Sequence, residues 1–237
     1  MSRPGIFADV RNFMLHRPAI PTLVEYTSRA EREDYGQRIM QRIDVSVEHY
    51  AILNVHRIGV DAPVAFVFEQ FRTWGPRSVW WPNRIAKLEA ADPELKQIRV
   101  FFLGRKRHFL GLKLPFFGLN VIPLFDMNVL KIQEVPDSLD QDNARYMLYR
   151  CDGGYPVGIV ILYVRSAIRD RGEPDRTHVF FGVGFNFYGK EDWPERHFIN
   201  SVWETIHNRV TGNVLNRFKT ECETRFARVL AGDDEGA

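Results

Sequence analysis

The chain has 237 residues, of which 45% are hydrophobic and 26% are charged, so its composition excludes a disordered, collagen-like or disulfide-stapled protein. The 32 Lys and Arg residues and 30 Asp and Glu residues leave a formal net charge of +2, which gives no reason to expect nucleic acid as a partner. A domain of this length buries enough apolar surface to fold without a metal or a disulfide.

Cysteine usage and hydropathy bear on the compartment. The cysteines, Cys151 and Cys222, are far apart in sequence and form no CxxC pair, which favours inert thiols in a reducing compartment. Residues 1–23 mix charged and apolar side chains and lack the apolar core of a signal peptide. The longest uncharged apolar run, 114–125, is shorter than the roughly 20 residues that a membrane span needs. We therefore expect a cytoplasmic protein.

The first 50 residues differ from the rest of the chain. Pro4, Pro18 and Pro21 punctuate their start, and residues 28–42 are polar with apolar side chains at helical spacing. We expect residues 1–50 to form an N-terminal extension that carries one helix.

The main domain opens with a strand pattern over residues 52–60. The pattern ends at Asp61-Ala62-Pro63, where an N-capping residue and a proline suited to a first turn favour the start of a helix. The apolar side chains that follow lie on one stripe and predict a helix over residues 64–71.

Strand-like runs separated by turn-forming residues come next. We predict these strands near residues 84–90, 96–103, 127–135, 144–151, 157–168 and 177–188. With the strand over residues 52–60, they indicate a seven-stranded antiparallel meander.

A long amphipathic helix ends the sequence. A capping-box pattern begins at Asp192, and apolar residues recur at helical spacing as far as Leu230. Gly232 is the predicted C-terminal stop, and Gly212 is a predicted point of kinking or splitting. We expect residues 233–237 to be a disordered acidic tail.

Three stretches carry a resemblance to a known family. They are the strand end and helix from Val60-Asp61-Ala62-Pro63 to Phe71, the Trp80-Trp81-Pro82 run, and residues 210–219 of the last helix. These stretches and the order of elements resemble the SRPBCC superfamily, also called START/Bet v-like or helix-grip proteins. The resemblance implies an α+β helix-grip fold over residues 51–232, in which a curved seven-stranded antiparallel sheet wraps around the long C-terminal helix.

The resemblance also implies a largely apolar cavity between the sheet and that helix. Members bind lipids, sterols, polyketides or other hydrophobic small molecules, and some are cyclases, aromatases or dehydratases. We expect binding of a hydrophobic small molecule or lipid. Two alternatives stay open: a polyketide cyclase-, aromatase- or dehydratase-like enzyme, and a non-enzymatic interaction module. No spacing typical of a zinc, dinucleotide or nucleotide-phosphate site occurs, so we expect neither metal nor cofactor.

The last two predicted strands are apolar on both faces. In the final strand Phe181 and Val183 share one face, while Gly182 and Gly184 share the other. If one face meets the helix, the other needs a cover, and either the N-terminal extension or a second copy in a homodimer would supply it.

The connection over residues 104–125 joins a basic cluster to a long apolar run. Three interpretations stay open: a buried connection packed on the core, a lid over a lipid cavity, and peripheral contact with an anionic membrane.

Polar side chains beside the two strand glycines and on the last helix are candidates for orienting a ligand in an apolar cavity. His207 is also a candidate general acid or base, which would exchange protons together with Tyr188 in the enzyme alternative. The predicted ligand-binding residues are Phe102, Leu112, Phe116, Phe117, Asn186, Tyr188, Trp203 and His207.

Overall fold

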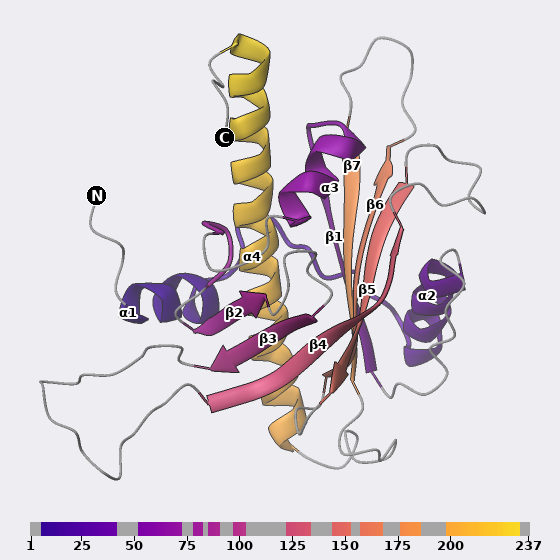
Figure 1. Ribbon diagram of the computed structural model, residues 1–237. Helices are drawn as coiled ribbons and strands as arrows, with labels where there is room; N and C mark the ends of the chain where they lie inside the picture. The colour runs from indigo at the N-terminus through magenta and orange to yellow at the C-terminus, as the bar shows by residue number, and fades with distance from the viewer. Residues whose placement is uncertain are drawn as a thin grey trace, which may run out of the picture.

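A single sheet and a long C-terminal helix dominate the computed structural model (Figure 1). The structure describes residues 6–41, 52–72, 78–82, 85–90, 97–102, 122–133, 144–152, 157–167, 176–185 and 198–232. Its helices are α1 (Ile6–Asp9), the π-helix η1 (Val10–Leu15), α2 (Arg29–Gln41), α3 (Val64–Arg72) and α4 (Phe198–Ala231). Its strands are β1 (Ile52–Val60), β2 (Ala86–Ala90), β3 (Gln97–Phe102), β4 (Ile122–Gln133), β5 (Ala144–Asp152), β6 (Val157–Ser166) and β7 (Thr177–Phe185).

The sheet has the strand order β1-β7-β6-β5-β4-β3-β2, and every neighbouring pair is antiparallel. Strands β2 to β7 form a meander, and β1 joins it by pairing with β7, so that Ile52 faces Phe185 and Val60 faces Thr177. The predicted α+β class, with an antiparallel sheet and a long C-terminal helix, is confirmed.

Strand β4 begins earlier than the sequence predicts, at Ile122 rather than at residue 127. Proline usually interrupts a strand, because it cannot donate to the ladder, and Pro123 therefore concealed the start. Here Pro123 pairs with Phe101 beside a register shift in the β3–β4 ladder, where a missing donor is tolerated. Residues 103–121 lie outside the described part of the chain, so the lid and membrane interpretations of residues 104–125 stay predictions.

The N-terminal segment holds helical structure that the sequence does not predict. Helices α1 and η1 lie between Pro4 and Pro18, so neither proline interrupts them. Phe13 is buried in the main core. The centre of the Phe13 ring lies 5.6 Å from the guanidinium carbon of Arg217 on α4. The prediction of one helix in the extension is therefore wrong, because tertiary packing against α4 stabilises a second helical segment.

Residues 13–24, which we call the strap, are held to α4 through their main chain. Asn213 Nδ2 donates to the carbonyls of Phe13 and His16 at 2.9 Å each. Asn216 accepts from the amide of Ile20 and donates to its carbonyl, also at 2.9 Å. These contacts hold the strap through its backbone, so they depend on the α4 asparagines more than on the strap sequence.

The strap then crosses from α4 to the free edge of the sheet. The amide of Arg57 donates to the carbonyl of Thr22 at 2.7 Å, and the amide of Val24 donates to the carbonyl of Val55 at 3.0 Å. An edge strand exposes unpaired backbone groups that invite other chains. The strap covers part of this edge on β1.

Helix α4 runs without interruption through Gly212, so the predicted kink is wrong. The glycine serves a close approach instead: a Cβ atom at this position would lie 2.5 Å from Cγ of Pro18 and 3.2 Å from Oγ1 of Thr22. The strap therefore packs where α4 lacks a side chain. The predicted stop is confirmed, since Gly232 follows the helix with a positive φ of 75°.

Helix α2 lies on the side of the sheet opposite α4 (Figure 1). Its start is fixed by a capping box in which the amide of Glu31 donates to Oγ of Ser28, and Glu31 Oε2 accepts from the amide of Thr27. Side chains on this second face of the sheet are buried, among them Val55, Ile161, Tyr163 and Phe180. The extension therefore contributes to the cover of the second face, which is one of the two predicted covers.

On the first face, α3 and the C-terminal half of α4 enclose an aromatic core. The rings of Phe71 and Phe218 stack with centroids 3.9 Å apart, and Trp80 meets both of them edge-on. Cys222 is buried beside this core as a free thiol, and burial raises its pKa, which agrees with the inert role predicted for it. Cys151 lies on β5, and its side chain is outside the description.

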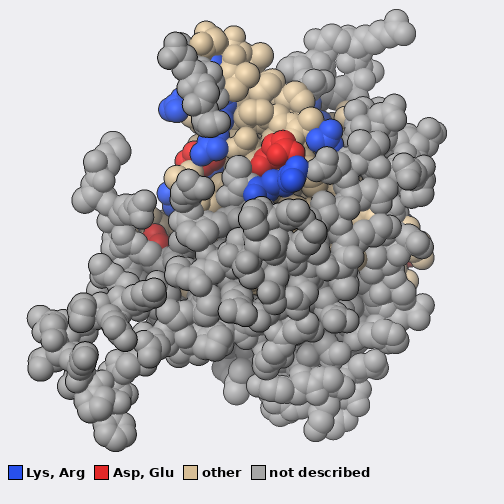
Figure 2. Space-filling view, viewed as in Figure 1, with Lys and Arg blue, Asp and Glu red and all other residues tan. Residues whose placement is uncertain are grey.

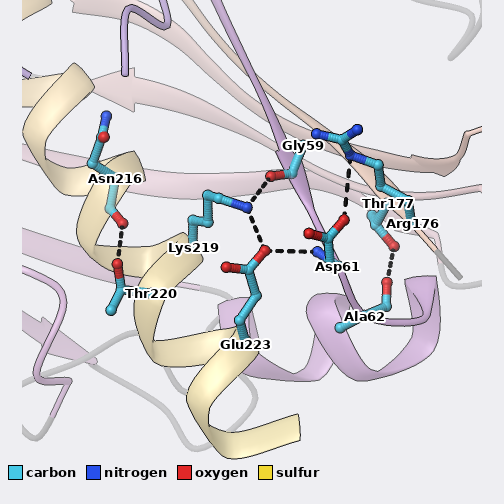
Figure 3. A network of polar contacts seen from close by, with 9 residues as sticks. All are labelled: Gly59, Asp61, Ala62, Arg176, Thr177, Asn216, Lys219, Thr220 and Glu223. Atoms are coloured by element: carbon cyan, nitrogen blue, oxygen red, sulfur yellow. Dashed lines mark hydrogen bonds and ion pairs between the residues drawn. The ribbon is translucent and has the colours of Figure 1, made fainter. Parts of the chain in front are cut away.

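A polar clasp joins the C-terminal half of α4 to the end of β1 (Figure 3). Lys219 Nζ donates to the carbonyl of Gly59 at 2.9 Å and pairs with Glu223. Glu223 in turn accepts the amide of Asp61 at 2.8 Å. The clasp satisfies two main-chain groups at the turn where β1 ends.

Charged side chains of both signs surround the clasp. Figure 2 shows the described Lys and Arg residues beside Asp and Glu where α3 and the C-terminal half of α4 lie. The pairs in this region include Arg72 with Glu69 at 3.3 Å and Arg176 with Asp61 at 3.5 Å. This described part of the face therefore carries charges of both signs. In the described part of the chain, no helix has the length and apolar character required to cross a membrane.

We expect Gly212→Ala to lower the free energy of unfolding by about 1–3 kcal/mol, because the new methyl group would overlap Pro18. Helix propensity alone predicts the opposite, a gain of about 1 kcal/mol. Urea denaturation of the variant measures the sign. Adding Pro18→Ala should restore part of the loss, and a stabilised Gly212→Ala protein would refute the close packing of the strap.

Lys219→Met should lower the free energy of unfolding by about 1–2 kcal/mol, since it removes a charged donor from the Gly59 carbonyl and leaves Glu223 unpaired. Thermal and urea denaturation measure this change. Arg225→Met is the matched control on the same helix, because Arg225 makes an exposed contact with Gln70 and its loss should have little effect. Equal effects of the two substitutions would contradict the role given to the clasp.

Candidate functional site

The predicted ligand-binding residues fall into three groups. Leu112, Phe116, Phe117, Asn186 and Tyr188 lie outside the described residues. Phe102 and Trp203 lie on β3 and α4, and only their backbone is described: Phe102 pairs with Ala86 and with Ile122. His207 is the member of the set whose side chain is described, and it lies on the N-terminal half of α4.

The structure brings His207 near four other polar residues that the sequence did not single out. Thr22 comes from the strap, Asn54 and His56 come from β1, and Asn208 follows His207 on α4. We call these five residues the polar cluster. Thr22, Asn54 and His56 are 4%, 2% and 0% exposed, whereas His207 and Asn208 are half-buried, so three members are interior and two are partly accessible.

Strand pairing explains why β1 presents both polar and apolar residues to α4. Asn54 pairs with Val183 and His56 with Phe181, while Ile58 pairs with Val179. Because side chains alternate, these residues share the face that meets the helix. The inward face of β1 is therefore polar at Asn54 and His56 and apolar at its end, where the aromatic core lies.

One amide oxygen links the cluster. Asn208 Oδ1 accepts from Asn54 Nδ2 at 3.0 Å and from His56 Nε2 at 3.2 Å. An amide oxygen can only accept, so His56 carries its proton on Nε2. Its Nδ1 then accepts from the hydroxyl of Thr22, which lies 2.9 Å away. The chain of hydrogen bonds thus fixes one tautomer of His56 and joins the strap, β1 and α4.

Both histidines of the cluster are neutral at physiological pH. Burial lowers the pKa of His56 to about 4, and its hydrogen bond to Asn208 opposes only part of this shift. Burial lowers the pKa of His207 to about 3, and the neighbouring His56 adds to the effect. The cluster consequently offers hydrogen-bonding groups without a net charge.

Two arginines near the polar cluster already have partners. Arg32 of α2 forms an ion pair at 3.4 Å with Glu204, which lies one turn before Asn208 on α4. Arg209 donates to the carbonyls of Met14 and Leu15 in the strap.

Among the described residues, no group of three potential metal ligands occurs. The arrangement is suited to hydrogen bonding with a small polar group and to proton exchange through an imidazole.

The two strand glycines do not serve the face that meets α4. Gly182 pairs with Val55 and Ile161, whereas Phe181 and Val183 pack toward the main core. These glycines therefore do not clear space between the sheet and the helix. Alternation divides the residues of a strand into two faces, but it does not identify which face the helix covers.

Sequence reasoning could have found part of this cluster. Asn54 and His56 stand at alternating positions of a strand that is otherwise apolar on that face, which marks them as buried polar groups. Thr22 left no such signal, because it meets His56 only through the path of the strap.

Comparison with known proteins finds similar solved structures. No protein-family model matches the chain, and no curated protein matches it. The Zhui aromatase/cyclase from Streptomyces sp. R1128 is similar at 17% identity and a TM-score of 0.45, with 74% of this chain and 95% of that chain covered.

Two further solved structures are similar to this chain. A Polyketide_cyc-like protein from Corynebacterium glutamicum has 10% identity and a TM-score of 0.36, with 78% of this chain and 97% of that chain covered. Ara h 8.0201 has 9% identity and a TM-score of 0.39, with 73% and 98% covered. These structures are members of the SRPBCC superfamily, which the sequence itself resembles.

Acid should destabilise the protein through His56. Between about pH 6.5 and pH 4 the unfolded chain binds a proton on this histidine and the native state does not, so the free energy of unfolding falls as the pH is lowered. The shift corresponds to about 3 kcal/mol over that window. Urea denaturation across the window should show a shallower fall for His56→Gln than for the unchanged protein.

His16→Gln is the matched control, since His16 is exposed at the end of η1. Its pH dependence should equal that of the unchanged protein. If His56→Gln also retained the full fall in stability, the burial of a neutral His56 would be refuted.

Proposed function

We propose that the protein binds a hydrophobic small molecule or lipid between the sheet and the N-terminal half of α4, as a helix-grip protein in which the sheet curves around the helix. The observation that carries the proposal is an uncharged hydrogen-bonding cluster set into an apolar helix–sheet interface. A few convergent polar groups in apolar surroundings are typical of a site that binds and orients such a molecule.

The two halves of α4 support this location. Phe71, Trp80 and Phe218 fill the space at the C-terminal half with stacked and edge-on rings. The polar cluster lies toward the other end, near His207. Phe102, Trp203 and His207 are proposed ligand contacts from β3 and α4, and Leu112, Phe116, Phe117, Asn186 and Tyr188 are proposed from the sequence.

The test is native mass spectrometry of freshly purified protein, followed by solvent extraction and identification of what leaves the folded chain. We expect a discrete lipid or aromatic molecule, and uptake of a fatty alcohol, a sterol or an aromatic polyketide by the extracted protein. A folded chain that copurifies with nothing and takes up none of these would refute the proposal.

The two neighbouring imidazoles are the basis of a second candidate, an enzyme of the cyclase, aromatase or dehydratase class. His207 lies near His56 in the neutral form that accepts a proton, although a pKa of about 3 makes it a weak base at neutral pH. Extraction from a folded His207→Leu variant separates the two functions. Binding alone predicts the same copurifying molecule, in equal or smaller amount, whereas catalysis predicts the accumulation of a different one.

A further inference from the structure

We infer that the polar cluster recognises a neutral hydroxyl or carbonyl group of the bound molecule and discriminates against carboxylates. The inference rests on the proposed binding function and adds the chemical class of the group that is recognised. It is carried by the pattern of used and unused hydrogen-bonding positions on Asn54 and Asn208.

The oxygen of Asn208 is fully used, because it accepts from both Asn54 and His56. Within the described part of the chain, two positions of the same pair have no partner: the acceptor Oδ1 of Asn54 and the donor Nδ2 of Asn208. The two positions belong to side chains that a 3.0 Å hydrogen bond joins. The pair therefore offers one acceptor and one donor.

A hydroxyl group matches this pair, since it can donate to Asn54 Oδ1 and accept from Asn208 Nδ2. A carbonyl group uses the donor alone. A carboxylate can only accept, so one of its oxygens would face the lone pairs of Asn54 Oδ1. The hydrogen-bonding pattern ranks the three groups in that order.

The charge of the surroundings leads to the same ranking. His56 and His207 are neutral, and burial disfavours their protonation. Arg32 is paired with Glu204, and Arg209 is bound to strap carbonyls. Among the described residues around the cluster, none would therefore supply a countercharge to a carboxylate bound there, and an unpaired charge is costly in a protein interior.

Arg145 on β5 is a cation on the same face of the sheet. Its guanidinium carbon lies 5.9 Å from the ring centre of Phe68 on α3. Across the sheet, Asn54 pairs with Val183, Val183 with Val160, and Val160 with Tyr149. Arg145 lies four residues before Tyr149 on β5. Four residues correspond to about 13 Å along a strand. Arg145 therefore cannot serve the group that contacts Asn54.

The test compares three probes of similar shape by isothermal titration calorimetry with the full chain at neutral pH. They are 2-naphthol, which is neutral, 2-naphthoate, which is anionic, and naphthalene, which has no polar group. We expect 2-naphthol to bind at least about tenfold more tightly than 2-naphthoate, and more tightly than naphthalene.

Two variants locate the preference. Asn54→Leu and Asn208→Leu should each reduce the advantage of 2-naphthol over naphthalene by about tenfold. Asn12→Leu is the matched control, because Asn12 is exposed on η1 and should leave all three affinities unchanged. Circular dichroism establishes that each variant is folded. If a cluster variant does not fold, the ratio of the two affinities in the unchanged protein decides the matter.

The outcomes separate this inference from the proposed function. Binding of 2-naphthoate as tight as that of 2-naphthol overturns the inference and leaves the binding function intact. Tight 2-naphthoate binding that Arg145→Leu abolishes also overturns it, and assigns the polar group to the other end of the sheet. If none of the probes binds, naphthalene included, the proposed function fails and the inference fails with it.

Discussion

The contact between α4 and the strap is the constraint on which the rest of the structure depends. Asn213 and Asn216 hold the strap main chain, and Gly212 lets Pro18 approach the helix more closely than any side chain would permit. The strap then continues to β1 and delivers Thr22 to His56. Without the strap, the edge of β1 would lose the main-chain hydrogen bonds that cover part of it. His56 would also lose the Thr22 hydroxyl, which donates to its Nδ1. The N-terminal residues are thus part of the site.

Helix α4 serves two different purposes along its length. Its C-terminal half meets aromatic rings and a clasp of charged groups, which fix the helix against β1 and α3. Its N-terminal half meets Asn54 and His56, where burial of polar groups costs stability unless each is hydrogen-bonded. A fold optimised for stability alone would place apolar residues at both ends. The retention of a buried polar cluster at one end is the feature that favours a binding role there.

Much of this architecture could be predicted from the sequence, because patterns of neighbouring residues determine the helices and strands. Alternation predicted the antiparallel sheet, the 3.6-residue period predicted α4, and Gly232 marked the end of that helix through its capping chemistry. The failures share a cause, which is contact between distant residues. Gly212 resembles a helix breaker until Pro18 is placed against it. Thr22 resembles a loop residue until the strap brings it to His56, 34 positions further along the chain.

The polar cluster also links ligand binding to the stability of the fold. Its hydrogen bonds join three segments that are far apart in sequence, so anything that orders Asn54 and Asn208 also orders the strap and α4. A ligand that hydrogen-bonds to the unused acceptor and donor of this pair would bind the native state and not the unfolded chain. Such a ligand would therefore stabilise the whole fold. Groups whose burial costs stability become favourable contacts when a ligand pairs with them. An uncharged and incompletely satisfied pair of amides, one buried and one half-buried, is thus better suited to recognising a molecule than to holding the fold together.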